Sequence, residues 1–119
     1  MPRILYIEDD ANNRMLVRRI LSAEGIQVDE ADHAQAGIQM ALDNPPDLIL
    51  MDISMPGMDG LTATQKIRSM PQIAHIPIIA LTANVMEGDR ERTLNAGCDG
   101  YIGKPLDVDS FAEQIVSYL

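Results

Sequence analysis

Short apolar runs alternate along this chain with longer stretches in which apolar residues recur at helical spacing. Unbroken apolar runs of this length are typical of strands that are buried on both faces, as in a parallel sheet. One further stretch alternates between apolar and polar residues, which indicates a weaker strand nearer a sheet edge. The four apolar runs lie at residues 4–7, 48–51, 76–81 and 100–103, and the alternating stretch lies at residues 26–31.

The intervening stretches predict helices. Gly25 is expected to end the first helix, and Asp32 to cap the second. Asp107 or Asp109 is expected to cap the last one. The helical patterns lie around residues 16–21, 36–41, 61–68, 89–96 and 111–119. Strict alternation of strand and helix predicts an α/β fold in which right-handed crossovers join parallel strands, with helices on both faces of the sheet.

Length and charge limit what such a domain does. The 119 residues fit one domain, residues 1–119. The net charge of −9 and the four aromatic residues argue against direct binding of nucleic acid, which needs a basic face. No apolar run approaches the length of a membrane span, so we expect no membrane insertion. A single cysteine, Cys98, forbids an internal disulfide and suits a cytoplasmic protein.

Polar residues follow four of the predicted strands directly. They are Glu8 and Asp9, Asp52, Thr82, and Lys104. The carboxyl ends of parallel strands share one edge of a sheet, which is where α/β proteins bind ligands. Three carboxylates brought together there repel one another, and we expect each to raise the pKa of the others. A hard cation such as Mg²⁺ would hold them together, and Lys104, one of only two lysines, adds a positive charge.

These residues belong to four motifs: ILYIED at residues 4–9, DLILMDISMPGMDG at 47–60, PIIALTA at 77–83 and KP at 104–105. With these motifs in this order, the chain resembles the receiver domain of two-component response regulators over its full length. The resemblance implies a flavodoxin-like (βα)5 three-layer sandwich with a five-stranded parallel sheet of order 2-1-3-4-5. The stretch at residues 82–92 is most similar to receivers of hybrid kinases and of single-domain cell-cycle regulators.

The resemblance also implies a metal site and a phosphoacceptor. Asp52 would accept a phosphoryl group from a histidine kinase or a histidine phosphotransferase. Mg²⁺ would be held by Asp9, Asp52 and the backbone carbonyl of Ser54, while Glu8 would act through a water molecule. Glu8 is a departure, because many members of the family have a second aspartate there. Such a domain promotes its own phosphorylation and dephosphorylation and turns over no separate metabolite.

The same resemblance assigns roles to the remaining strand-end residues. Thr82 would bond one phosphoryl oxygen and Lys104 would pair with another. Phosphorylation would draw the Thr82 hydroxyl inward, and the Tyr101 ring would turn into the vacated space. A downstream protein effector would then bind the face built from the fourth helix, the last strand and the last helix. The resemblance further suggests a cis peptide bond between Lys104 and Pro105.

Two other function classes share parts of this pattern. A haloacid-dehalogenase-type phosphatase also places an aspartate nucleophile after a strand, but its general acid two residues later is replaced here by Ser54. A flavodoxin-like cofactor binder needs a phosphate-cradling loop after the first strand, where this chain has acidic residues at 8–10 that repel phosphate. Within the receiver family, a stand-alone regulator and a receiver excised from a hybrid kinase or multidomain regulator both remain open.

Overall fold

Five strands alternate with five helices over the part of the chain that the computed structural model describes, residues 2–55, 57–83 and 87–119. The strands are β1 (Arg3–Ile7), β2 (Gln27–Ala31), β3 (Leu48–Asp52), β4 (Ile78–Thr82) and β5 (Gly100–Gly103). The helices are α1 (Ala11–Ser22), α2 (Ala34–Asp43), α3 (Gly60–Arg68), α4 (Glu87–Asn95) and α5 (Val108–Val116). All five strands predicted from the sequence are therefore present.

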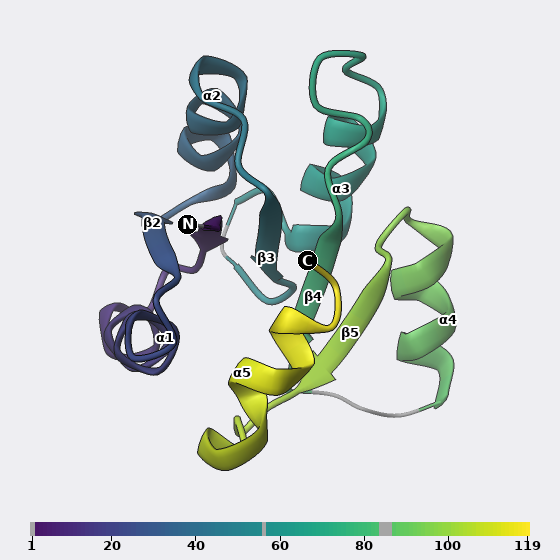
Figure 1. Cartoon of the computed structure of the whole chain (residues 1–119). Coiled ribbons are helices and arrows are strands. Elements are labelled where there is room, and N and C mark those ends of the chain that lie inside the picture. The colour runs from purple at the N-terminus through teal and green to yellow at the C-terminus, as the bar shows by residue number, and fades with distance from the viewer. Residues whose placement is uncertain (1, 56, 84–86) are drawn as a thin grey trace.

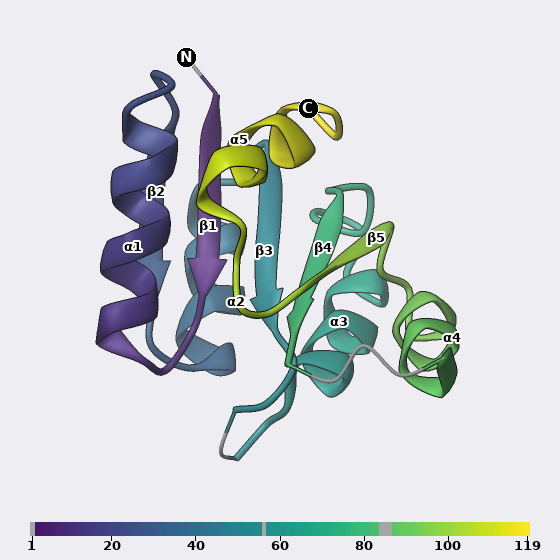
Figure 2. The same cartoon turned by 90° about the horizontal axis from the view of Figure 1, so that it is seen from below.

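The strands form one parallel sheet in the order β2-β1-β3-β4-β5, which confirms the predicted topology. Helices α1 and α5 cover one face of this sheet, and α2 and α3 cover the other (Figure 1; Figure 2). Helix α4 lies beside β5 at the edge of the sheet (Figure 1). The chain thus has helices on both faces of a parallel sheet, as its alternating pattern predicts, and forms the three-layer sandwich that the resemblance implies.

The central strands are apolar throughout because both of their faces are covered. Every residue of β3 and β4 is buried, whereas β2, at the edge, is exposed or half-buried over four of its five positions. Alternate side chains of β3 enter different cores: Ile49 and Met51 pack with α2 and α3, while Leu48 and Leu50 pack with α1 and α5. Burial of each such side chain contributes roughly 1.5–3 kcal/mol to folding.

Helix caps connect the strand ends to the helices that follow. Asp10 accepts hydrogen bonds from the backbone N–H groups of Asn12 and Asn13, at 2.8 and 3.3 Å, and so starts α1. Only three residues separate β1 from α1. Asp59 caps α3 in the same way through Thr62, at 2.8 Å. Capping carboxylates satisfy N–H groups that a helix leaves unpaired. The links that follow β1 and β3 are therefore fixed at both ends.

The prediction for the second helix cap is wrong. The residue before α2 is His33, which makes no capping hydrogen bond, and Asp32 instead pairs with the His33 ring at 2.7 Å between Oδ1 and Nδ1. Asp32 lies one residue too early to reach the free N–H groups of a helix that begins at Ala34. At the last helix the cap is Asp107, while Asp109 lies in the first turn.

The described structure has three further features. The peptide bond between Lys104 and Pro105 is cis, which confirms that prediction. No helix among the described residues combines the length and the hydropathy that a membrane crossing requires. Cys98 is buried and unpaired.

Candidate functional site

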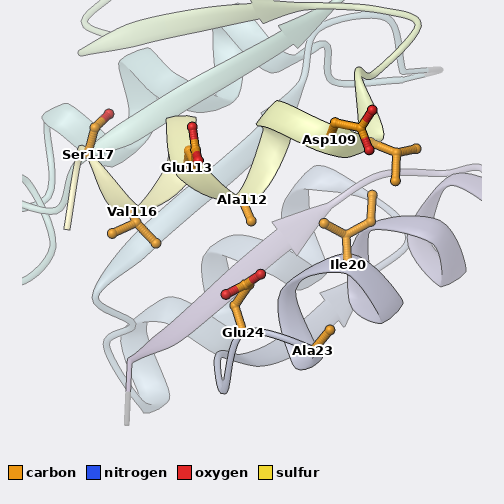
Figure 3. A pocket seen from close by; sticks show the side chains of 9 residues that line it. Ile20, Ala23, Glu24, Asp109, Ala112, Glu113, Val116 and Ser117 are labelled. Atoms are coloured by element: carbon orange, nitrogen blue, oxygen red, sulfur yellow. The ribbon is translucent and has the colours of Figure 1, made fainter.

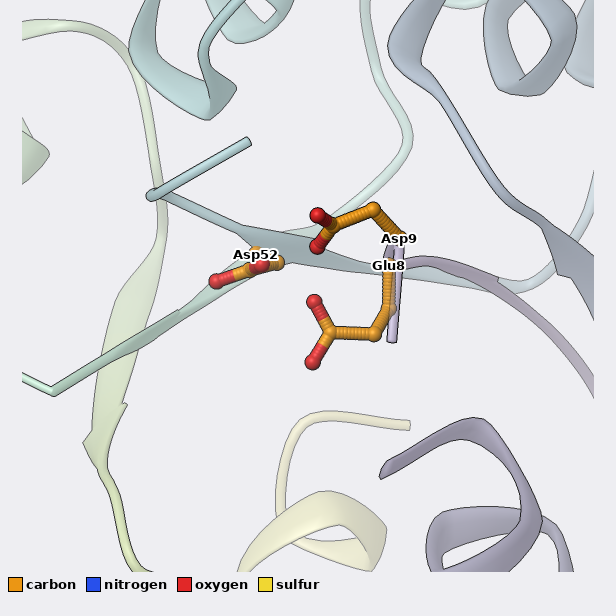
Figure 4. Close-up of side chains that lie close together, drawn as sticks. All are labelled: Glu8, Asp9 and Asp52. Atoms are coloured by element: carbon orange, nitrogen blue, oxygen red, sulfur yellow. The ribbon is translucent and has the colours of Figure 1, made fainter. Parts of the chain in front are cut away.

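The parallel topology brings the strand-end polar residues to one edge of the sheet. Glu8 and Asp9 directly follow β1, Asp52 ends β3 and Thr82 ends β4. Strand β3 lies between β1 and β4, and its register pairs Met51 with Ile7 across the ladder to β1. Asp52 is therefore the neighbour of the acidic pair, as Figure 4 shows.

Three carboxylates form the centre of this edge. One oxygen from each of Glu8, Asp9 and Asp52 lies within 4.8 Å of the other two. Glu8 and Asp52 are only 1% and 2% exposed, whereas Asp9 is exposed. In Figure 4 the side chains of Glu8 and Asp9 point toward Asp52 from the same end of β1. The structure thus brings together the three acidic side chains that the sequence singled out.

Lys104 bridges two of these carboxylates. Its ammonium nitrogen Nζ donates to Asp52 Oδ1 at 3.0 Å and to Glu8 Oε1 at 3.1 Å. The backbone N–H of Ser54 also donates to Asp52 Oδ1, at 3.3 Å. Charge-assisted hydrogen bonds of this kind are stronger than neutral ones and hold a buried carboxylate in one orientation. Lys104 therefore supplies the positive charge expected from its place after β5.

The electrostatic environment shifts the pKa values of the two buried carboxylates in opposite directions. Burial, reinforced by the neighbouring Asp52, raises the pKa of Glu8 from 4.5 to about 7. Burial also acts to raise the pKa of Asp52, but its contacts with Glu8 and Lys104 outweigh that effect and leave the pKa below its ordinary value. Burial lowers the pKa of Lys104, yet the bonds to Asp52 and Glu8 leave it raised. The expectation that every carboxylate has a raised pKa is thus wrong for Asp52, because the contacts with Glu8 and with the Lys104 ammonium favour its charged form.

Two residues that the sequence analysis missed hold Glu8 in place. The Tyr6 hydroxyl donates to Glu8 Oε1 at 3.3 Å, and the side-chain amide of Asn13 donates to the same oxygen at 2.7 Å. Tyr6 is fully buried, and Asn13 lies in the first turn of α1. The role of Asn13 could have been found from Asp10, a typical helix-capping residue. If Asp10 caps the helix, α1 begins at Ala11, and the polar side chains of its first turn lie near the end of β1.

The second carboxylate oxygen of Glu8 bears on whether the site suits a metal ion. Glu8 Oε2 is buried and has no hydrogen-bond partner among the described residues. A buried acceptor without a partner costs free energy unless something else satisfies it. Oxygen ligands from several carboxylates are what hard divalent cations such as Mg²⁺ prefer. The acidic cluster therefore fits a divalent cation, with Lys104 as the cationic neighbour.

The other predicted site residues lie on the β4 and β5 side of the edge. Thr82 is buried, and its backbone carbonyl accepts a hydrogen bond from the Lys104 N–H at 2.7 Å. Tyr101 lies on β5, pairs with Ala80 of β4 and is half-buried. The guanidinium carbon of Arg90, on α4, lies 5.9 Å from the centroid of the Tyr101 ring. The switch role of Thr82 and Tyr101 and the metal contact of the Ser54 carbonyl stay predictions.

Comparisons with known proteins agree with this geometry. The family model of the response regulator receiver domain matches residues 4–116. The polar-differentiation response regulator DivK of Brucella anthropi is 39% identical over 120 residues, which cover 100% of this chain and 98% of that protein. DivK of Brucella ovis is also 39% identical, over 98% of this chain and 94% of its own length.

Solved structures show the same fold. The receiver domain of a sensor histidine kinase from Pseudomonas aeruginosa PAO1, solved with a magnesium ion in its active-site cleft, is 33% identical with a TM-score of 0.89. That similarity covers 98% of this chain and 96% of the solved one. The chemotaxis protein CheY4 of Vibrio cholerae has a TM-score of 0.94 at 24% identity, over 100% of this chain and 99% of its own, and shows the fold alone. None of these findings favours the phosphatase or the cofactor-binding alternative. The chain belongs to the family of response regulator receiver domains.

Proposed function

We propose that Asp52 is the phosphoacceptor through which this receiver domain carries its signal. The observation that supports this most strongly is the position of the Asp52 carboxylate: it is buried at the strand-end edge, bonded to Lys104 and adjacent to two further carboxylates. A histidine kinase or a histidine phosphotransferase is the donor, because a phosphorylated imidazole is a reactive source of the phosphoryl group. Phosphorylated Asp52 then alters the binding of a downstream protein.

The proposed transfer forms one bond and breaks one. An Asp52 oxygen forms a bond to phosphorus while the bond between phosphorus and the donor nitrogen breaks, and that nitrogen keeps the electron pair. The hydrogen bonds that Asp52 accepts from Lys104 and from the Ser54 N–H both end on Oδ1, so we assign Oδ2 as the attacking oxygen. Lys104 offsets part of the repulsion between the anionic carboxylate and the anionic phosphoryl group. Thr82 lies at the end of the neighbouring strand, where its hydroxyl donates to a phosphoryl oxygen.

The acyl phosphate that results is a mixed anhydride. Water attacks its phosphorus, inorganic phosphate leaves and the Asp52 carboxylate is restored. The domain therefore promotes only its own phosphorylation and dephosphorylation. Such a mark is temporary by its own chemistry, as a signalling domain requires.

Mg²⁺ is the cofactor we propose for this site. Asp9, Asp52 and the backbone carbonyl of Ser54 would hold it, with Glu8 acting through a water molecule. The spacing of the carboxylates, the buried Glu8 Oε2 without a partner and the magnesium ion in the Pseudomonas aeruginosa receiver support this assignment. A bound Mg²⁺ supplies charge neutralisation at the phosphoryl oxygens.

We propose the face of α4, β5 and α5 as the surface that reports phosphorylation to the effector, in the cytoplasm. Thr82 and Lys104 link the site to this face through the hydrogen bond between their backbones. Tyr101 supports it as well, since its ring lies on β5 beside Arg90 of α4. Comparison of amide chemical shifts with and without a beryllofluoride mimic tests it. The largest changes away from Asp52 should fall within residues 82–119, and changes confined to α1 and α2 would contradict it.

Acetyl phosphate with Mg²⁺ tests the phosphoacceptor directly. Intact-mass measurement should show one added phosphoryl group on the wild type and none on Asp52→Asn. Asp59→Asn is the matched control, because asparagine caps a helix as well as aspartate does and the fold is kept. Equal labelling of wild type and Asp52→Asn would contradict the assignment.

The metal ligand has its own pair of variants. Asp9→Asn should weaken Mg²⁺ binding and slow phosphorylation together, because it removes one anionic ligand. Asp10→Asn, one residue later, removes the same charge but keeps the cap of α1, and should leave both properties near those of the wild type. Equal Mg²⁺ affinity of Asp9→Asn and wild type would show that the ligand set is wrong.

A further inference from the structure

A groove of about 620 Å³ lies between α1 and α5, on the side of these helices that faces away from the sheet. Figure 3 shows Ile20 of α1 and Ala112 and Val116 of α5 in the space between the two helices. Val108 and Val116 are 56% and 51% exposed. The floor of the groove is thus apolar and open to solvent.

The exposed part of this apolar floor is not needed to hold the helices on the sheet. Helix α1 already buries Val17 and Leu21 against the sheet, and α5 buries Phe111 and Ile115, all fully. Ile20 and Ala112 are half-buried and also contact that core, whereas Ala23, Val108 and Val116 are exposed, so the domain leaves an apolar strip between the two helices partly uncovered. Exposed apolar patches rimmed by polar residues mark interaction sites on soluble proteins.

The rim of the groove is acidic. Glu24 at the end of α1 and Asp109 and Glu113 on α5 line it, and no basic residue does so in the described parts of the chain (Figure 3). None of these three carboxylates forms a salt bridge among the described residues. Unpaired carboxylates around an apolar floor are complementary to a partner that combines apolar and cationic side chains.

From this charge pattern we infer that the groove binds an amphipathic helix of a protein partner, with an apolar stripe flanked by lysine or arginine. The lining part of α5 spans Val108 to Val116, about 12 Å at 1.5 Å per residue, which matches roughly two turns of a bound helix. Anchors at positions i, i+3 or i+4, and i+7 of the partner would then contact the floor.

The acidic rim also argues against other occupants. A second copy of this chain would bring the same carboxylates together across a two-fold interface, where like charges repel. Nucleic acids and anionic membranes carry the same sign of charge as the rim. The inference does not depend on phosphorylation of Asp52, so unphosphorylated protein serves for its test.

The probe is a fluorescein-labelled synthetic peptide with leucines at i, i+4 and i+7 of one helical face and lysines on both sides of them. Its control is a peptide of the same composition with the leucines dispersed around the helix. Fluorescence anisotropy at physiological salt should show saturable binding of the first peptide and at least fivefold weaker binding of the second. Equal binding of the two would mean that charge alone attracts them and would overturn the inference.

Two variants separate the apolar floor from the acidic rim. Val116→Glu adds a negative charge but removes an apolar anchor, so affinity should fall about fivefold or more, whereas a purely electrostatic attraction would become stronger. Glu113→Lys should also weaken binding about fivefold. The matched control Glu91→Lys makes the same charge change at an exposed position of α4 and should stay within about twofold of wild type.

All three positions are exposed, so we expect circular dichroism to show that the variants fold like the wild type. Unchanged affinity for Val116→Glu, or equal loss for Glu91→Lys and Glu113→Lys, overturns the inference. Sedimentation velocity of the wild type gives a further check. A dimer that Val116→Glu dissociates would show that a second copy of the chain occupies the groove, and would also overturn it.

Discussion

Gly60 is the residue at which a single methyl group would most directly disturb the site. It is buried at the start of α3, behind the loop that follows Asp52. A Cβ atom added there would clash with the Asp52 carbonyl oxygen and lie 2.9 Å from Ile53 Cα. Both neighbours are backbone atoms, so no side chain can rotate away and the strand end or the helix must move.

The net effect of Gly60→Ala follows from two opposing contributions. Overpacking of a rigid site costs typically about 1–3 kcal/mol, and contacts this short with backbone belong at the upper end. Alanine in place of glycine within a helix favours folding by about 1 kcal/mol. We therefore expect the free energy of unfolding to fall by about 2 kcal/mol and the rate of phosphorylation by acetyl phosphate to fall as well, since Asp52 is displaced.

Gly57→Ala in the same loop is the matched control. Its backbone φ is +78°, so alanine is strained there by roughly 1–2 kcal/mol, but an added Cβ meets nothing within 4 Å. Gly57→Ala should thus lower stability while the phosphorylation rate stays near that of the wild type. Urea unfolding followed by circular dichroism gives both free energies. A Gly60→Ala protein as stable as the wild type would refute the close-approach argument.

Three further predictions concern single residues, with stability measured by urea unfolding. Because the pKa of Glu8 rises from 4.5 to about 7 on folding, the metal-free folded state binds more protons in that interval, so its stability should fall as pH rises from 4.5 to 7. Glu8→Gln should flatten this part of the pH profile, and an unchanged slope would count against the raised pKa. Arg68 donates to four acceptors at 2.7–2.9 Å, and Arg68→Ala should cost about 2 kcal/mol or more, while the exposed Arg19→Ala stays within about 0.5 kcal/mol. Asp107→Ala should cost about 1 kcal/mol through loss of the α5 cap, and a similar cost for Asp109→Ala would show that the cap is misassigned.

The sheet and the acidic cluster were predictable because the relevant signals are local. Buried parallel strands need unbroken apolar runs, and the residue after each run must reach the same edge of the sheet. Asp52 and Lys104 were found in this way. The order of the strands came from the resemblance to a known family, since no local pattern states which strands are neighbours.

What the sequence did not show depends on the exact ends of the elements and on contacts between distant segments. The hydrogen bond from Asn13 to Glu8 requires the exact start of α1, and the apolar stripe of that helix gave only its middle. The lowered pKa of Asp52 depends on the placement of the Lys104 ammonium, 52 positions later in the chain. The prediction of the α2 cap was wrong for a related reason, because a shift of one residue decides whether a carboxylate reaches the free N–H groups of the helix.

The bonds from Lys104 to Glu8 and Asp52 join the last strand-end to the first, so the site is complete only late in synthesis. A nascent chain that has emerged as far as β4 holds all three carboxylates but not their ammonium partner. Domains fold as they emerge from the ribosome, amino-terminal parts first. An incomplete chain therefore lacks the ammonium that pairs with Asp52, and we expect phosphorylation at this edge to require the fully translated domain.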